Sequence, residues 1–470
     1  MPATVFDSGI FRDAFGAPAM RAVFDDAALI ARYVEVEVAL AAAEAKAGVI
    51  PKDAAAAIKR LARADAIDMG RLKEETDLVG YPIVGVVHQL ARQCGEAGRY
   101  VHWGATTQDI MDTATVLQVR EALGLVADDL AALEGTLAAL ADKHRATVMA
   151  GRTHLQHALP VTFGHKAAVW LGMVVRHRQR LEQLRPRVLV GQFAGAAGTL
   201  ASLGDRGLAV HDALMAELGL GRPATPWHAA RDGLAETVSF LALVAGTLAK
   251  IATDVMLMMQ TEVGEAFEPF LEGRGSSSTM PQKRNPISCE LILAAARIVR
   301  QHAGLMLDAM AADHERATGP WQLEWVAVPE AFLAVGGALR QARFMADGLI
   351  VDAGRMRRNL DITGGLIVAE AVMMALAKHT GRGAAHDLIY GACRAALDKG
   401  STLLDELKRR PEVTDHLDAD RLAELTDPVN YLGSAQAMID RALAARPSPP
   451  KRKPADRTGR KRRTPGTRPA

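Results

Sequence analysis

Residues 126–140 read VADDLAALEGTLAAL, and they give the clearest indication of fold class in this chain. Apolar side chains recur there at intervals of three and four residues, which places them in one stripe along a helix of many turns. The stripe consists of Val126, Leu130, Leu133, Leu137 and Leu140. A second stripe of the same kind consists of Leu241, Val244, Leu248, Ile251, Val255 and Met258. Long helices with such stripes must bury them against other helices, which predicts a helical bundle.

Proline placement extends this prediction along the chain. Three long stretches, residues 83–159, 227–268 and 330–410, lack proline and are therefore expected to be helical. Strand signals are few and short, so we predict an all-α fold of three domains with a central bundle of long helices. The expected divisions are an N-terminal helical domain at 1–110, the bundle at 111–348, a C-terminal helical domain at 349–445 and a disordered basic tail at 446–470.

Composition excludes several classes of protein. The chain has 470 residues, of which 49% are hydrophobic and 23% charged, an ordinary globular mixture that excludes a mostly disordered or collagen-like chain. Its three cysteines are far apart and form no CxxC pair, so neither a disulfide framework nor a zinc ribbon is expected. The N-terminus lacks the apolar core of a signal peptide, and no uninterrupted run of 18 apolar residues occurs. We therefore expect a cytoplasmic protein that does not enter a membrane.

The charge is unevenly distributed. Residues 446–470 contain ten Lys or Arg and one acid, so the tail carries +9 and the remainder of the chain about −7. Six prolines and the lack of large apolar side chains predict a solvated, disordered extension. A nucleic-acid interaction would rest on this tail alone, and we expect no specific one.

The segment most informative about function is residues 275–286, GSSSTMPQKRNP. Its first four residues are typical of a flexible linker, but a linker has no reason to carry Met-Pro, a lysine and Asn-Pro in succession. Asn285 and Pro286 are expected to cap and begin a helix from 287 to about 313, whose first amides attract anions. A mobile loop with hydroxyls, amides and a cation beside such a helix suits proton abstraction and anion stabilisation.

These residues resemble the signature loop of the fumarase/aspartase superfamily, Ser-Ser-x-Met-Pro-x-Lys-x-Asn. Two further segments resemble the other signature regions in the same order along the chain: residues 104–109, GATTQD, and residues 151–156, GRTHLQ. Thr107 stands where Ser is usual in the first of them. The resemblance covers roughly residues 6 to 445 and leaves out the basic tail.

The resemblance implies an anti β-elimination without cofactor or metal, which releases fumarate or a related product from a small dicarboxylate-type substrate. Ser277, the first serine of the loop core, is the implied base, although the residues alone leave Ser276 and Ser278 open. Lys283 and the loop amides would stabilise its alkoxide while loop closure excludes water. The implied substrate-binding residues are Thr106, Thr107, Gln108, Ser278, Asn285 and Arg316.

His154 is the implied general acid or leaving-group partner. A histidine flanked by Thr and Leu, considered alone, is more often structural than catalytic. Its place in the motif reverses that interpretation. Glu290, five residues after Asn285, has the spacing of the glutamate that pairs with this histidine in fumarase-like members. The alternative role for Glu290 is structural: its negative charge would compensate the positive end of the helix dipole at a helix N-terminus. Superfamily members are homotetramers whose active sites combine three subunits, so a homotetramer with composite sites is expected.

Further segments resemble one branch, the bacterial 3-carboxy-cis,cis-muconate cycloisomerases; among them are residues 226–228 (PWH) and 355–361 (RMRRNLD). Those enzymes carry Trp at the position of His154 and no acid at that of Glu290. Both departures favour elimination of a heteroatom, which benefits from an acid at the leaving group. We therefore favour a carbon–heteroatom lyase acting on a succinyl-amine type of substrate, with the cycloisomerase as first alternative. Adenylosuccinate-lyase-type activity and epimerisation through fumarate are further alternatives.

Overall fold

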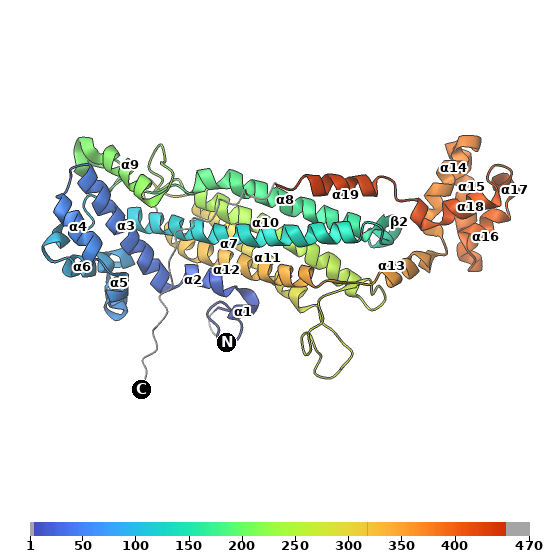
Figure 1. Ribbon diagram of the computed structural model, residues 1–470, viewed down its shortest axis with the longest axis horizontal. Helices are drawn as coiled ribbons and strands as arrows, with labels where there is room; N and C mark the ends of the chain where they lie inside the picture. The colour runs from blue at the N-terminus through green and yellow to red at the C-terminus, as the bar shows by residue number, and fades with distance from the viewer. Residues whose placement is uncertain (1–3, 317, 448–470) are drawn as a thin grey trace, which may run out of the picture.

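The computed structural model describes residues 4–316 and 318–447 of the chain. The molecule is elongated, with a central bundle of long helices between a smaller helical region at each end (Figure 1). The mostly helical fold with a central bundle is confirmed. The predicted tail lies outside the described residues from position 448 onward.

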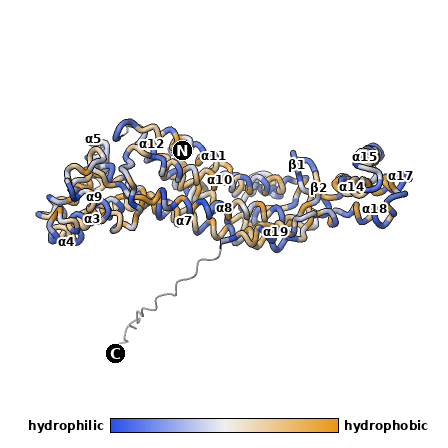
Figure 2. The backbone as a smooth tube through the Cα atoms, turned by 90° about the horizontal axis from the view of Figure 1, so that it is seen from above, coloured by the Kyte–Doolittle hydropathy of each residue, from blue (hydrophilic) through white to orange (hydrophobic). Residues whose placement is uncertain are grey.

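Five long helices form the bundle. They are α7 (Thr107–Lys143), α8 (Phe163–Val188), α10 (Asp232–Met259), α11 (Ile287–Ala309) and α12 (Pro320–Asp347). The predicted stripe of α7 faces the interior: Val126, Leu130 and Leu137 are at most 1% exposed. Burying such a side chain contributes roughly 1.5–3 kcal/mol, so these stripes hold the helices together. Figure 2 shows hydrophilic and hydrophobic residues alternating along the bundle, as amphipathic helices require.

Helix α10 is long and apolar enough to cross a membrane by length and composition. Within this structure, however, it is a core helix that packs against α8, α11 and α12. Val244 and Leu248 on its stripe are at most 1% exposed. Its apolar content is therefore accounted for by the bundle.

The N-terminal region packs along one side of the bundle through its first two helices, and its remaining helices lie across one end (Figure 1). Its helices are α1 (Arg12–Phe15), α2 (Pro18–Val23), α3 (Asp26–Lys46), α4 (Lys52–Leu61), α5 (Met69–Val79), α6 (Pro82–Gln93) and, from later in the chain, α9 (Gly207–Leu218). Helix α3 packs on both α7 and α9. One apolar core contains Leu40 of α3, Val86 of α6, Ile110 of α7 and Leu214 of α9. The first turns of α7 are thus held rigidly at this end.

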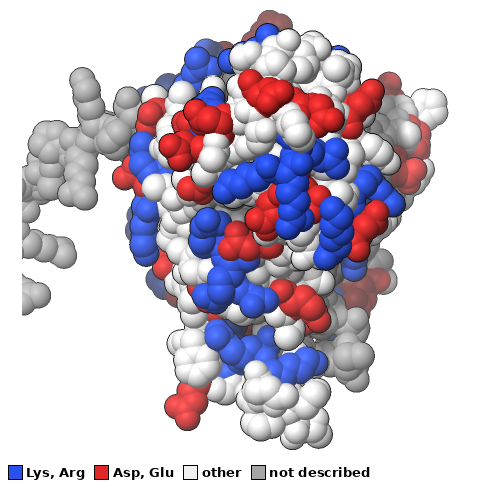
Figure 3. Space-filling view, turned by 90° about the vertical axis from the view of Figure 1, so that its right-hand side faces the viewer, with Lys and Arg blue, Asp and Glu red and all other residues white. Residues whose placement is uncertain are grey.

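The C-terminal region lies at the other end. Its helices are α13 (Ala353–Leu360), α14 (Ala369–Thr380), α15 (Arg382–Lys399), α16 (Leu403–Lys408), α17 (Pro411–Thr414), α18 (Ala419–Thr426) and α19 (Ala435–Ala444). Charges of both signs are interspersed on its outer face (Figure 3). Helix α19 leaves this region and returns along α8, where Ile439 joins the bundle core. Arg446 then donates to Glu134 of α7 at 2.9 Å, so the chain is anchored on the bundle where the tail was expected to begin. The domain boundaries near 110, 348 and 445 stay predictions.

Two short antiparallel pairs interrupt the helices. Strands β1 (Val148–Thr153) and β2 (Gln156–Thr162) form a hairpin, and β3 (Ala266–Phe267) pairs with β4 (Ile350–Val351). Residues 148–159 of the hairpin lie in a proline-free stretch that was expected to be helical, and that expectation is wrong for these residues. The β1-β2 hairpin follows α7 directly and lies at the end of the bundle next to the C-terminal region (Figure 1).

The start of α11 also differs from the expectation. Pro286, not Asn285, occupies the cap position, the helix begins at Ile287, and no capping bond from the side chain of the cap residue is present. The carboxylate of Glu268 accepts instead from the backbone N–H groups of Ser288 and Cys289, at 3.1 and 2.8 Å. A cap supplied from twenty residues earlier in the chain replaces the local one. The helix ends at Ala309, a few residues short of the predicted end near 313.

Candidate active site

The signature segment forms a projecting loop, here called the serine loop (residues 273–286), between β3 and α11 (Figure 1). Its base is closed by a backbone bond from Asn285 N–H to Gly275 O at 2.9 Å and by a bridge between Ser276 and Arg284. Gly275 has φ +70°, and a Cβ there would lie 2.6 Å from the carbonyl oxygen of Asn285. Only glycine permits this closure, which leaves residues 277–283 as the tip.

Ser277 occupies a defined position in the tip. Its Oγ accepts the backbone N–H of Met280 at 3.1 Å and, more weakly, that of Thr279 at 3.4 Å. Backbone amides of the loop were expected to stabilise the Ser277 oxygen, and these two N–H groups are placed to do so. Ser276 donates to the carbonyl of Gly273, and Ser278 is exposed with no hydrogen bond to the described residues. Of the three serines, Ser277 is the one whose oxygen receives amide donors in this conformation.

The remaining predicted residues of the loop and of the first turn of α11 face solvent or the loop surface. Lys283 and Glu290 are exposed and Asn285 is half-buried. With the other described residues, their side chains form no hydrogen bond or ion pair. The amides of Ser288 and Cys289 are occupied by Glu268, so these two are not free to bind a substrate anion. The polar groups free at this end are therefore side chains rather than helix amides.

His154 lies at the tip of the β1-β2 hairpin, here called the histidine hairpin. His154 and Leu155 form the two-residue turn with φ +50° and +64°, a left-handed conformation that non-glycine residues adopt only at a cost. The hairpin is tied to the segment before the serine loop, because Arg152 forms a bidentate ion pair with Glu265 at 2.7 and 2.8 Å. Glu265 is fully buried and also accepts from Asn359. The imidazole of His154 is exposed, and no bond to Glu290 is formed within the chain.

Thr106, Thr107 and Arg316, here called the threonine corner, lie at the opposite end of the bundle. Arg316 Nη2 donates to Thr106 Oγ1 and to the carbonyl of Ala196, both at 2.9 Å. The structure thus brings two of the predicted substrate-binding residues together, although they are 210 positions apart. Thr107 is the first residue of α7, and its hydroxyl bonds to none of the described residues.

Asp109 fixes the threonine corner, a role the sequence analysis did not assign. Its carboxylate accepts the backbone N–H groups of Thr106, Ala194 and Gly195, each at 2.9 Å. Nε2 of His228 lies 2.8 Å from the same carboxylate, and both side chains are at most 3% exposed. Asp109 and His228 belong to separate sequence motifs, residues 104–109 and 226–228, and the fold brings them into contact.

Gln108 points inward from the first turn of α7. Its Nε2 donates to Asp112 and to the carbonyl of His228, each at 3.0 Å, and its Oε1 is buried with no partner in the described part of the chain. Asp112 belongs to a buried ion network with Arg231 and Glu324 that the sequence analysis also missed. Although burial acts to lower it, the two carboxylates raise the pKa of Arg231. Substrate binding by Gln108 stays a prediction.

The predicted site residues thus form two groups within one chain. The serine loop, Glu290 and the histidine hairpin lie toward the C-terminal end of the bundle, and the threonine corner lies at the N-terminal end. Helix α11, roughly 35 Å long at 1.5 Å per residue, separates the serine loop from Arg316. Helix α7, roughly 55 Å long, separates Thr107 from the histidine hairpin. One chain does not bring these groups together.

Comparison with known proteins identifies the family. The model of the Lyase family matches residues 13–300, and that of the adenylosuccinate lyase C-terminus matches residues 365–442. The 3-carboxy-cis,cis-muconate cycloisomerase of Pseudomonas aeruginosa is 49% identical over 93% of this chain and 96% of its own length. The nitrosuccinate lyase of Streptomyces davaonensis is 43% identical over 94% of this chain and 95% of its own.

A solved structure gives the same result. The crystal structure of a fumarate lyase from Mesorhizobium sp. BNC1 superimposes with a TM-score of 0.87 at 57% identity, over 92% of this chain and 99% of that one. The first family model covers the N-terminal region and much of the bundle, the second covers most of the C-terminal region, and these relatives each cover more than nine-tenths of the chain. The protein is accordingly an enzyme, and the chain belongs to the fumarase/aspartase superfamily of lyases.

Proposed function

We propose that the protein is a cofactor-independent carbon–heteroatom lyase, which performs an anti β-elimination on a small succinyl-type substrate and releases fumarate or a fumarate-like product. The observation that carries this proposal is the position of Ser277, whose Oγ receives the amide N–H of Met280 in an exposed, closed-base loop. A serine is too weak a base unless its alkoxide is stabilised, and amide donors beside a cation supply that stabilisation.

In the proposed reaction, the Ser277 alkoxide takes a proton from the carbon beside a substrate carboxylate. The electron pair left on that carbon forms the double bond as the bond to the heteroatom breaks on the opposite face. Lys283 and Asn285 bind the carboxylate whose charge grows in the transition state. His154 gives a proton to the departing heteroatom, and Glu290 orients and charges its imidazole.

We further propose that each site is shared between copies of the chain in a cytoplasmic homotetramer. The support is the separation of the two groups of residues by the length of α7 and α11. An antiparallel arrangement of two bundles would bring the threonine corner of one copy to the serine loop of another. Thr106, Thr107, Gln108 and Arg316 would then bind the second carboxylate from the opposite side.

The cycloisomerase activity is the second candidate, favoured by the 49% identity to the Pseudomonas aeruginosa enzyme of that name. It needs no acid at a leaving nitrogen, whereas His154 and Glu290 are suited to supply one. The name of the nitrosuccinate lyase relative supports the elimination candidate.

The experiment is an ultraviolet assay for fumarate with a panel of N- and S-substituted succinates, and 3-carboxymuconate as the rival substrate. Release of fumarate from at least one succinate, abolished in Ser277→Ala, would support the lyase. Turnover of 3-carboxymuconate alone would move the assignment to the cycloisomerase.

A further inference from the structure

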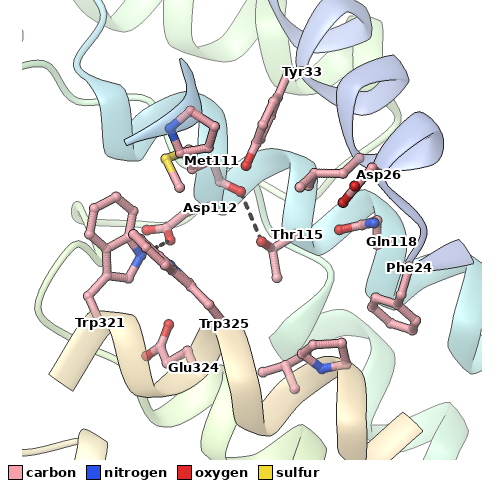
Figure 4. A pocket seen from close by; sticks show the side chains of 14 residues that line it. Phe24, Asp26, Tyr33, Met111, Asp112, Thr115, Gln118, Trp321, Glu324 and Trp325 are labelled. Atoms are coloured by element: carbon pink, nitrogen blue, oxygen red, sulfur yellow. Dashed lines mark hydrogen bonds between the residues drawn. The ribbon is translucent and has the colours of Figure 1, made fainter. Parts of the chain in front are cut away.

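A cavity of about 290 Å³ lies within one chain, between α3, α7 and α12 (Figure 4). This volume is at the lower end of the range for small-molecule pockets, so any occupant must be small. Its lining includes acidic and aromatic side chains, among them Tyr33, Asp112, Glu324 and Trp325.

The polar part of the wall carries negative charge. Asp26, Asp112 and Glu324 line the cavity, and no Lys or Arg of the described chain does. Arg231, behind the wall, bonds to both Asp112 and Glu324 and can neutralise only one of them. Each Glu324 oxygen accepts a single hydrogen bond, and burial raises the pKa of Glu324 against the opposing effect of Arg231. A cation in the cavity would relieve this cost of holding two buried carboxylates against one guanidinium.

Tyr33 supplies an independent indication. The side chain is only 2% exposed, and its hydroxyl has no hydrogen-bond partner among the described residues. Figure 4 shows the hydroxyl directed from α3 into the cavity, toward Asp112 and Thr115 of α7. Because the hydroxyl faces the cavity and bonds to none of the described residues, it is available to a ligand there.

Four aromatic rings contribute to the wall. Trp321 and Trp325 on α12 pack edge to face with centroids 5.1 Å apart, and Tyr33 and Phe24 also line the cavity. Trp321 Nε1 donates to Asp112 at 3.0 Å, which fixes the orientation of its ring. Trp325 also lines the cavity and is 38% exposed. Ring faces beside carboxylates are the surroundings that attract organic cations.

We propose that this cavity binds a small organic ammonium ion that carries an apolar body. The ammonium N–H groups donate to the free lone pairs of Glu324 and to the Tyr33 oxygen, while the aromatic rings cover the apolar body. An ammonium ion bound in this way would balance the surplus negative charge of the wall and would give the Tyr33 hydroxyl a hydrogen-bond partner. It does not depend on the proposed elimination reaction.

Benzylammonium chloride is a suitable probe, with neutral benzyl alcohol as its uncharged counterpart. Binding to the full chain is measured by isothermal titration calorimetry and by tryptophan fluorescence, since two of the five tryptophans line the cavity. Saturable binding of benzylammonium at millimolar concentration is expected, at least tenfold tighter than binding of benzyl alcohol. Equal binding of the two, or no saturable binding of benzylammonium, would overturn the proposal.

Three variants locate the binding. Trp325→Leu removes a ring face and should weaken the Kd about threefold to thirtyfold. Tyr33→Phe removes only the hydroxyl, and Asp26→Asn removes a charge at the exposed rim; both should weaken the Kd severalfold. Trp103→Leu changes an exposed tryptophan outside the cavity and should leave the Kd unchanged. If Trp325→Leu and Tyr33→Phe both fold, as circular dichroism reports, and bind as wild type does, the assignment to this cavity is wrong.

Discussion

Met280 N–H donates to Ser277 Oγ across 3.1 Å, so the serine oxygen is supported by its own loop before any substrate is present. Ser278, its neighbour, has no comparable donor among the described residues. The first prediction follows from this difference. Ser277→Ala should lower kcat by about 10³-fold, the usual range for loss of a general base, with the melting temperature unchanged. Ser278→Ala is the matched control and should lose much less activity. If the larger loss falls on Ser278→Ala, the base is misassigned.

The second prediction concerns the base of the serine loop. Gly275→Ala places a Cβ 2.6 Å from the carbonyl oxygen of Asn285, whereas Gly273→Ala meets nothing within 4 Å. Both glycines have positive φ, near +70°, so both variants carry the cost of a left-handed alanine, about 1–2 kcal/mol. Only Gly275→Ala should also displace Asn285 and Lys283, lowering kcat at least tenfold beyond Gly273→Ala. Steady-state kinetics of the pair decide this, and equal losses would mean that closure at Asn285 is unimportant.

The third prediction separates the two candidate reactions. His154→Trp removes the proposed acid and should lower fumarate release about 10²–10⁴-fold, while lactone formation from 3-carboxymuconate is unchanged or improved. Leu155→Ala changes the other residue of the same turn, is 74% exposed in wild type, and should leave both activities nearly normal. No effect of His154→Trp on either reaction would defeat the role assigned to this histidine.

The fourth prediction concerns stability and pH. Glu44 on α3 is fully buried, and neither carboxylate oxygen has a hydrogen-bond partner among the described residues. Burial, reinforced by Glu37, raises the pKa of Glu44 to about 9. The folded state therefore favours the protonated form of Glu44. The contribution of this protonation to the free energy of unfolding is complete below about pH 4.5 and is lost as pH rises toward 9.

Replacing this group with a neutral amide should remove that pH dependence. Glu44→Gln should raise the free energy of unfolding at pH 7 by on the order of 1–3 kcal/mol, and the gain should grow with pH between 5 and 8.5. Urea unfolding at several pH values measures it. Glu74→Gln, at an exposed position of α5, should show no such trend. A gain for Glu44→Gln that is independent of pH would contradict the ionisation argument.

Local patterns in the sequence were sufficient to predict the bundle. The spacing of Val126, Leu130 and Leu137 specifies a helix face, because the period of 3.6 residues is a property of the segment itself. The histidine hairpin was missed because no local pattern marks it. Its turn residues, His154 and Leu155, have positive φ, but they lack the Asn-Gly sequence that is typical of such turns.

Long-range contacts were beyond the reach of these patterns. The expected cap at Asn285 was wrong because Glu268 supplies the capping carboxylate from outside the motif. The ion network of Asp112, Arg231 and Glu324 joins three distant helices or loops, and no spacing rule connects them. The signature motifs predicted which residues carry chemistry, while the fold revealed that one chain keeps them apart.

The shared site can be tested by mixing two inactive variants. Ser277→Ala disables the serine loop, and the double variant Thr107→Ala/Arg316→Ala disables the threonine corner. When the two are differently tagged, unfolded together and refolded, mixed assemblies can be purified by both tags. If each site takes these groups from different copies, about a quarter of the sites in randomly mixed assemblies contain both intact groups, and fumarate release returns to about that fraction of wild type. Mixed assemblies no more active than either parent would contradict a site shared between chains.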